Sequence, residues 1–195
     1  MGTRDGATAA GRAAAVLAAG ALALAAGAAG APAALADGPD TPPQVLAEIE
    51  ALEWPEYSFG DTDTDVAVAG YLLRHLGHFT GEPRDHFTTY TEDAVTAFQE
   101  DADLHVTGTL NQETWTALRG AVFGEWGRGL PNDSGDPVRA IQYSLAVDYG
   151  KDLVVDGRYG ARTEAAVEEV QREFGIDDDG IVGEITLRAM VCGGV

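Results

Sequence analysis

The sequence is poor in cysteine. Its 195 residues include one, Cys192, which is followed by two glycines and a valine. A disulfide within one chain needs two cysteines, so a disulfide framework is excluded. A catalytic thiol needs a histidine held beside it, and the short tail after Cys192 is typical of a frayed end. We therefore expect a free thiol, or an incidental disulfide between chains, rather than a nucleophile.

Basic residues are also scarce. The sequence has 12 Lys and Arg against 32 Asp and Glu, which gives a formal net charge of −20. Proteins that bind nucleic acid or dock on anionic lipid use Lys and Arg to attract phosphates, so this balance speaks against both partners. A strong net charge favours solubility and says little about the fold.

Signatures of metal enzymes are missing as well. His75, His78 and His86 lie within twelve residues, and the first two could share one face of a helix. However, the sequence has no HExxH motif, and Gly77 interrupts the helix between the two histidines. We therefore interpret these histidines as a polar helix end, and we expect neither a metal nor another cofactor.

The longest apolar run is only weakly hydrophobic. Residues 13 to 31 are mostly Ala, Leu and Gly, and Ala-Leu-Ala at positions 34 to 36 has the form of a signal-peptidase site. We predict a Sec-type signal peptide over residues 1 to 36 rather than a membrane helix, and no cysteine follows it to carry a lipid. The mature chain is expected outside the membrane, in the cell wall or medium. It would have 10 basic and 31 acidic residues, a net charge of −21.

The sequence repeats itself. Shifted by 72 residues, positions 53 to 119 align without a gap on positions 125 to 191. The identical pairs include Trp54 with Trp126, Tyr71 with Tyr143, Leu73 with Leu145, Gln99 with Gln171, and Gly108 with Gly180. A gapless match of this length indicates a duplication. We assign residues 53 to 119 to a first module, 120 to 124 to a linker and 125 to 195 to a second module.

Each module has the apolar spacing of three short helices. In the second module the spaced positions are Val138, Ile141, Leu145, Ala166, Val167, Val170, Phe174, Leu187 and Met190. Three amphipathic helices can close one small core, so the predicted fold is all-α, with two tandem three-helix bundles. A core of about 70 residues is marginal alone, so we expect the modules to support each other.

Residues 37 to 52 begin as an acidic, proline-containing linker. Val45, Leu46, Ile49 and Leu52 then keep helical spacing, which predicts a short helix. We expect this helix to pack on the first module.

Two Asp-Gly pairs bracket the middle helix of the second module. They are Asp156-Gly157 and Asp179-Gly180, in which glycine supplies a positive φ at little steric cost. Gly175, after the last apolar residue of the helix, stands where a C-cap belongs. The pattern predicts a turn, a helix and a second turn.

This stretch resembles the core of the peptidoglycan-binding family of small three-helix domains. The family signature is similar to D-G-x-F-G-x-x-T-x-x-A-V-x-x-F-Q, then a short gap and G-L-x-x-D-G-x-V-G-x-x-T. The matching residues are Asp156, Gly157, Tyr159, Gly160, Thr163, Ala166, Val167, Gln171, Gly175, Ile176, Asp179, Gly180, Val182, Gly183 and Thr186. The resemblance implies the three-helix fold and a cell-wall ligand, either the glycan strand or the stem peptide.

The first module departs from this signature. It has Arg84-Asp85 where the second has Asp156-Gly157, and Thr107 where the second has Asp179. It therefore keeps the scaffold but is expected to lose both Asp-Gly turns, and it also has Gly70 in place of Gln142. We interpret the first module as a weaker binder or a spacer.

Nine residues of the second module are candidates for ligand contact. They are Asp156, Gly157, Arg158, Tyr159, Thr163, Gln171, Asp179, Gly180 and Thr186. Arg158 is included because a guanidinium can hold a peptide carboxylate. For Gln171 and its counterpart Gln99, contact with a ligand and hydrogen bonding to a nearby loop both remain open.

The tryptophans divide into two groups. Trp115 lies on the apolar face of its helix, and we assign it to the core. Trp54 and Trp126 precede the helices of their modules, so they could stack on a sugar ring or pin the chain to the helices.

These features predict an exported protein that binds peptidoglycan without catalysis, mainly through the second module. The alternative is a module that docks on, or inhibits, a cell-wall hydrolase. An enzymatic function is disfavoured because two small binding modules take up about 140 residues.

Overall fold

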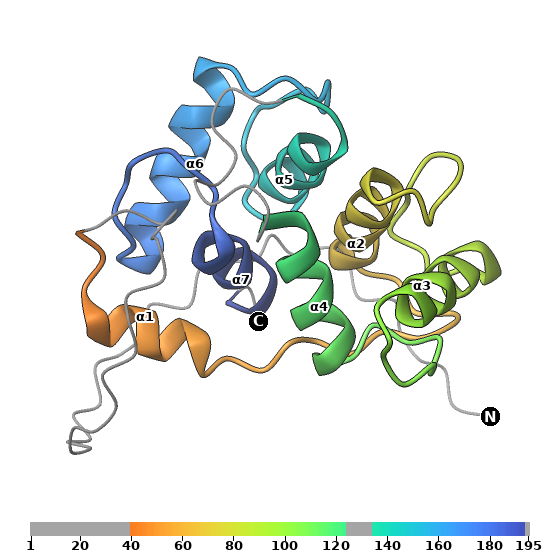
Figure 1. Ribbon diagram of the computed structural model, residues 1–195. Coiled ribbons are helices and arrows are strands. Elements are labelled where there is room, and N and C mark those ends of the chain that lie inside the picture. Colours follow the sequence, from red (N-terminus) through yellow and green to blue (C-terminus); the bar gives the residue numbers. More distant parts are fainter. Residues whose placement is uncertain (1–39, 124–133, 194–195) are drawn as a thin grey trace, which may run out of the picture.

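Every regular element is an α-helix in the parts of the chain that the computed structural model describes, residues 40–123 and 134–193. The helices are α1 Pro43–Glu50, α2 Thr64–His75, α3 Thr89–Asp101, α4 Gln112–Phe123, α5 Asp136–Val147, α6 Ala161–Phe174 and α7 Glu184–Cys192 (Figure 1). This confirms the predicted all-α class. None of these helices is long and apolar enough to cross a membrane. The predicted signal peptide and Trp126 lie outside the described residues.

Capping explains where the middle helix of the second module begins and ends. The residue before α6 is Gly160 in extended conformation, and the helix ends at Gly175 with φ 71°. Gly175 therefore forms the left-handed C-cap that the sequence predicted. The buried residues of α6 include Val167, Val170 and Phe174, so its apolar stripe faces the core.

The two modules pack through equivalent helices. The first module contains α2, α3 and α4, the second contains α5, α6 and α7, and α2 lies directly against α5 (Figure 1). Tyr71 and Tyr143, which are counterparts in the repeat, meet with ring centroids 6.1 Å apart. Contact between equivalent residues is typical of an interface with two-fold pseudosymmetry. The buried apolar residues of both modules form one continuous core, so the modules do support each other.

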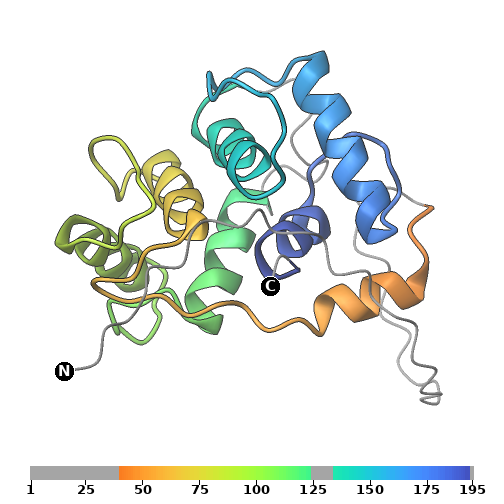
Figure 2. The ribbon, with the colours of Figure 1, turned by 180° about the vertical axis from the view of Figure 1, so that it is seen from behind.

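The short helix α1 packs on the second module, so our expectation that it would pack on the first was wrong. Seen from either side, α1 lies next to α7 (Figures 1 and 2). The Thr41 hydroxyl accepts a hydrogen bond from the backbone N–H of Asp177 at 3.0 Å, and Arg188 donates to the carbonyl of Leu52. Ile49, fully buried, joins the shared core. Polar contacts thus fix the two ends of this segment to the second module.

Residues 120 to 123, which we placed in the linker, are the last turn of α4. Val122 and Phe123 are buried, so the apolar stripe of this helix continues beyond the predicted boundary. Residue 124 lies outside the described residues.

Candidate functional site

The second Asp-Gly turn of the second module is held by one glutamine. The Gln171 amide nitrogen donates to the Asp179 carboxylate and the Ile181 carbonyl, each at 3.0 Å, and its oxygen accepts from the Gly180 N–H at 2.9 Å. The same nitrogen lies 3.4 Å from the Thr186 hydroxyl. Gly180 has φ 69°, as the turn requires. We call this arrangement a glutamine-clamped turn.

The first Asp-Gly turn is clamped in the same way by Gln142. Its nitrogen donates to the Asp156 carboxylate at 3.0 Å, the Arg158 carbonyl at 3.1 Å and the Thr163 hydroxyl at 3.2 Å. Its oxygen accepts from the Gly157 N–H at 2.8 Å, and Gly157 has φ 75°. We had noted Gln142 only as the counterpart of Gly70. The helical spacing of the sequence around Gln142 does not reveal the clamp, because Asp156 in the partner turn is 14 residues away along the chain.

The first module keeps one clamped turn, although it lacks the Asp-Gly pair. Gln99 donates to the Thr107 hydroxyl at 3.0 Å and to the Thr114 hydroxyl at 2.7 Å, and it accepts from the Gly108 N–H at 2.9 Å. Gly108 has φ 69°, the same as Gly180. Thr107 therefore replaces Asp179 with its hydroxyl, and the turn that we considered lost is present.

The other turn of the first module has a different interior. A Cβ atom on Gly70 would lie 2.9 Å from the Pro83 side chain, so this proline occupies space where a longer side chain would go. Backbone hydrogen bonds hold this turn: the Phe87 N–H donates to the Asp61 carbonyl and the Asp63 N–H to the Asp85 carbonyl, both at 2.8 Å. The second of these bonds has an equivalent in the second module, where the Gly135 N–H donates to the Gly157 carbonyl at 2.8 Å. Of the two turns that we expected the first module to lose, this is the one whose interior differs from the second module within the described residues.

The structure places five of the nine candidate residues inside the protein and four at its surface. Gly157, Thr163, Gln171, Gly180 and Thr186 are buried, whereas Asp156, Arg158, Tyr159 and Asp179 are at least partly exposed. The buried polar members take part in the clamps. In the structure the side-chain amides of Gln171 and Gln99 therefore form hydrogen bonds to a nearby loop and are not exposed. Ligand contact by the nine residues stays a prediction.

Tyr159 joins the two turns of the second module. Its hydroxyl donates to the Gly180 carbonyl at 2.7 Å. Burial raises the pKa of Tyr159 above its usual range, so the hydroxyl stays protonated and continues to donate. The two turns therefore form one connected scaffold beside α6.

A hollow of about 480 Å³ opens beside the first half of α6. Its lining residues are Tyr149, Gly150, Lys151, Asp152, Leu153, Arg162, Ala165, Ala166 and Glu169. None of the nine candidates is among them. The Lys151 ammonium pairs with the Glu169 carboxylate at 2.8 Å. Arg162 has no ion pair or side-chain hydrogen bond among the described residues.

The first module has a hollow of about 330 Å³ in the equivalent place, beside the first half of α3. Its lining residues are Phe79, Thr80, Gly81, Glu82, Arg84, His86, Thr88, Tyr90 and Thr91. Four of these correspond, under the shift of 72 residues, to lining residues of the second hollow. The duplication has therefore preserved a concave surface as well as the helices, which sequence periodicity alone could not show.

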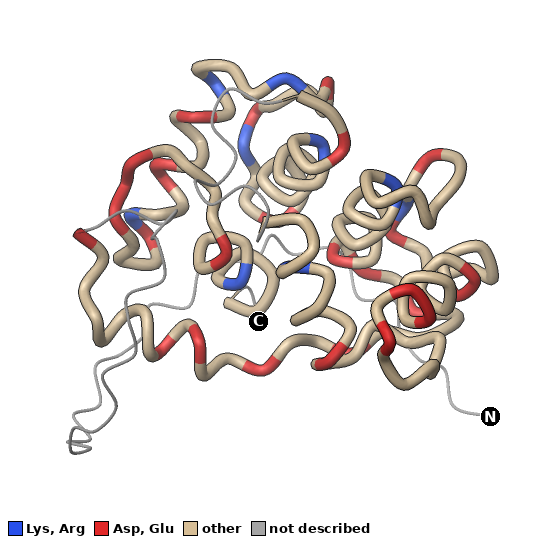
Figure 3. The backbone as a smooth tube through the Cα atoms, in the orientation of Figure 1, with Lys and Arg blue, Asp and Glu red and all other residues tan. Residues whose placement is uncertain are grey.

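Acidic residues outnumber basic ones along the chain. Asp and Glu positions occur on helices and loops of both modules, with few Lys and Arg positions between them (Figure 3). An unpaired arginine in such a hollow can attract a ligand carboxylate over a short distance, because a guanidinium donates two parallel hydrogen bonds.

The remaining sequence candidates are structural. Trp54 is 5% exposed and stacks on Trp115 with centroids 5.3 Å apart, while Arg188 lies 5.1 Å above its ring. Trp54 therefore pins the chain to the helices. Cys192 is buried, and burial raises the pKa of its thiol to about 12, which keeps it protonated.

The histidines of the first module do not gather into a metal site. His86 bonds to the Thr62 hydroxyl at 3.0 Å, and His78 packs edge-on against Phe98. Within residues 40–123 and 134–193 no group of three His, Cys, Asp or Glu is placed to hold a metal ion.

Two known proteins show similarity to parts of this chain. A stretch of 92 residues is 33% identical to the N-acetylmuramoyl-L-alanine amidase CwlM of Mycobacterium tuberculosis (strain ATCC 25618 / H37Rv), covering 45% of this chain and 23% of the amidase. A stretch of 58 residues is 45% identical to an uncharacterized protein in the bpoA1 3'region of Kitasatospora aureofaciens, covering 28% of this chain and 48% of that protein. The chain therefore spans about a quarter of the first relative and about half of the second.

The family described as "Putative peptidoglycan binding domain" matches this chain twice, over residues 62–118 and 134–190. The two matches fall on the helices of the two modules and together cover more than half of the 195 residues. Both matches are to a binding domain, and they show no catalytic domain. The protein belongs to the peptidoglycan binding domain family and carries two copies of the domain in tandem.

Proposed function

We propose that this protein binds cell-wall peptidoglycan without catalysis, outside the membrane, and mainly through the second module. The observation that carries the proposal is the match of both modules to the binding family, together with a hollow beside the middle helix of each. The second module is the principal site because both of its turns are clamped and its hollow is the larger. The candidate contacts at its surface are Arg158, Tyr159, Asp156 and Asp179.

Arg162 is the residue through which this proposal is tested most directly. We expect Arg162→Gln to weaken binding of the full chain to purified sacculi, since it removes a hydrogen-bonding cation from the hollow. The matched control is Arg172→Gln on the same helix, whose guanidinium is exposed and already pairs with Asp178 at 2.7 Å. Binding is measured by co-sedimentation, with chitin as the comparison polymer. If both variants bind sacculi equally well, the hollow is not part of the binding site.

The proposed location requires export. A protein purified from culture should begin at or near Asp37 and be found in the wall or medium, which N-terminal sequencing can determine. An intact Met1 in extracted membranes would contradict the signal peptide. If the protein does not bind sacculi but binds a secreted cell-wall hydrolase, the alternative function is favoured.

A further inference from the structure

The hollow of the first module differs in chemistry from that of the second. At the equivalent positions it has the rings of Phe79 and Tyr90 where the second module has Lys151 and Arg162. Tyr90 is 73% exposed, which is unusual for a large side chain with an apolar ring. A volume of about 330 Å³ falls at the small end of known ligand sites, which span about 300–1,000 Å³.

The hollow also contains a free cation. Arg84 lines it and has neither an ion pair nor a side-chain hydrogen bond within the described part of the chain. Acidic residues outnumber basic ones by 32 to 12, so carboxylate partners are abundant, yet none in residues 40–123 and 134–193 pairs with this guanidinium. An exposed guanidinium beside a concave surface can hold a carboxylate through two hydrogen bonds.

The acidic residue in the wall of the hollow does not compete for Arg84. Both carboxylate oxygens of Glu82 are occupied: Arg74 donates to one at 3.0 Å, and the Tyr71 hydroxyl donates to the other at 2.9 Å. The hydrogen bond from Arg74 lowers the pKa of Glu82, so the pair stays ionised and its charges offset each other. Arg84 is therefore the guanidinium of the lining that a ligand carboxylate can reach.

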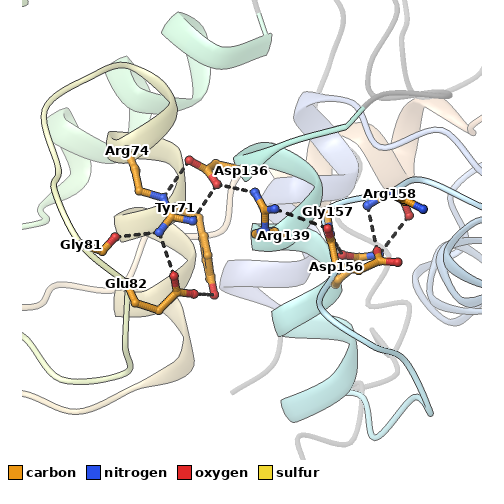
Figure 4. A network of polar contacts seen from close by, with 10 residues as sticks. Tyr71, Arg74, Gly81, Glu82, Asp136, Arg139, Asp156, Gly157 and Arg158 are labelled. Carbon is orange, nitrogen blue, oxygen red and sulfur yellow. Dashed lines mark hydrogen bonds and ion pairs between the residues drawn. The ribbon is translucent and has the colours of Figure 1, made fainter.

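The wall is fixed from the second module. Arg74 spans the boundary: its Nε and Nη2 atoms donate to the two oxygens of Asp136 on α5 at 2.8 and 2.7 Å, while Nη1 donates to the Gly81 carbonyl at 2.6 Å (Figure 4). Asp136 is also held by Arg139 at 2.9 Å. One guanidinium thus joins the loop that forms the wall to a helix of the neighbouring module.

We propose that this hollow is a second ligand subsite, which binds the terminal carboxylate of a short wall peptide at Arg84 while the second module fixes its wall through Arg74. The apolar faces of Phe79 and Tyr90 suit small aliphatic groups next to the carboxylate, and the Thr80 hydroxyl suits a peptide amide. The inference rests on the proposed function, because it assumes a cell-wall ligand. It assigns the first module a binding role instead of that of a spacer.

The test uses the full chain with Arg162→Gln, a substitution that we expect to weaken ligand binding at the hollow of the second module. We titrate it with the stem tetrapeptide bearing a free C-terminal carboxylate and with the same peptide amidated at its C-terminus, and follow backbone amide resonances by NMR. The free peptide should shift resonances of residues 79 to 91, and amidation should weaken its binding about tenfold. Equal affinity for the two peptides, or shifts elsewhere only, would overturn the subsite.

One further substitution in that background, with a matched control, locates the contact. Arg84→Gln should weaken binding of the free peptide about tenfold and leave the amidated peptide unaffected. Arg84 is exposed, so the fold should be retained, and Arg172→Gln serves as the matched control without effect. An unchanged affinity in Arg84→Gln would contradict the assignment.

Arg74→Lys tests the role of the second module as support. Lysine keeps the charge but cannot make the two parallel bonds to Asp136, so we expect the free peptide to bind several-fold more weakly with an unchanged circular dichroism spectrum. Unchanged affinity would mean that the wall does not depend on Arg74. Binding to sacculi distinguishes failure of the proposed function from failure of this subsite. If the unmodified chain does not bind sacculi, the proposed function is refuted. If it binds sacculi but Arg84→Gln leaves peptide binding unchanged, this subsite alone is refuted.

Discussion

The two modules share a scaffold but differ at the rim of the hollow. Both have a glutamine of the middle helix, Gln99 or Gln171, that clamps a turn with a glycine at φ 69°. At four equivalent lining positions, however, the first module has Phe79, Thr80, Gly81 and Tyr90, and the second has Lys151, Asp152, Leu153 and Arg162. Duplication thus preserved the buried hydrogen bonds of this turn, while the residues that line the hollow changed. Different rims on one scaffold imply different contacts with the ligand.

The turn before the middle helix shows how the scaffold tolerates change. Gln142 makes four hydrogen bonds there in the second module, whereas Gly70 and Pro83 fill the same region of the first module by packing. The interior of the turn has polar contacts in the second module and apolar packing in the first module. Both avoid buried groups without partners, which is the constraint that matters for stability.

Valine at Gly180 should have the largest effect. A β-branched residue at φ 69° costs about 1–3 kcal/mol in strain, and its Cβ would also lie 2.9 Å from the Glu164 side chain. We expect Gly180→Val to destabilise the protein and to abolish most binding to sacculi. Gly108→Val should cost a similar free energy of unfolding but spare most binding. Denaturant unfolding and co-sedimentation distinguish these outcomes. Loss of binding in Gly108→Val alone would reverse the roles of the modules.

Removal of a clamp should be nearly as costly. Gln142→Ala leaves the buried N–H of Gly157 without its acceptor, so we expect a loss of about 2–3 kcal/mol in the free energy of unfolding. The first module offers the comparison, because Gly70→Ala should also destabilise, through contact with Pro83 at 2.9 Å, without any change in hydrogen bonding. Amide exchange at Gly157 should accelerate in the first variant only. Slow exchange there would show that the clamp is not what holds the turn.

The boundary between the modules should depend on pH. Hydrogen bonds from Arg74 hold the pKa of Asp136 below its ordinary value of 3.8. A lowered pKa in the folded state means that the stabilisation is complete above pH 3.8 and is lost as the pH falls through the folded value. Asp136→Asn should therefore cost about 2 kcal/mol at pH 7 and progressively less below pH 4. Thermal unfolding of both proteins across pH 2–7 measures this difference, and a constant difference would contradict it.

Salt should have the smallest effect. The acidic chain and the carboxylates of the wall repel each other at long range, and salt screens this repulsion with a Debye length of about 8 Å at physiological strength. Direct hydrogen bonds in the hollow are screened less. Binding to sacculi should therefore stay level or strengthen from low to moderate salt. A steep decrease would show that charge attraction dominates, and a contact through arginines in a hollow would then be insufficient.

The helices were predictable because their pattern is local and repeated. The spacing of Val167, Val170 and Phe174, and the C-cap at Gly175, predicted α6 from neighbouring residues alone. The docking of α1 was not predictable, because its polar anchors, Asp177 and Arg188, are more than 130 residues away along the chain. Sequence periodicity contains no information about such a distant partner.

The candidate site was predictable only in part for the same reason. The family motif identifies Gln171, Asp179, Gly180 and Thr186 as a set, and the structure brings them together in one clamp. It does not say that Gln171 is fully buried, because a polar residue on a helix is normally assigned to the surface. The hollows were missed because they arise from the packing of the loop before each middle helix against that helix.

The central claim is binding without catalysis, and one incubation tests both parts. The full chain is mixed with purified sacculi and centrifuged, and then the protein in the pellet and the soluble wall fragments in the supernatant are measured. We predict that the protein is in the pellet, saturably, and that no fragments above the level of untreated sacculi are released. Protein that remains in the supernatant would contradict binding, and fragments that accumulate with time would contradict the absence of catalysis.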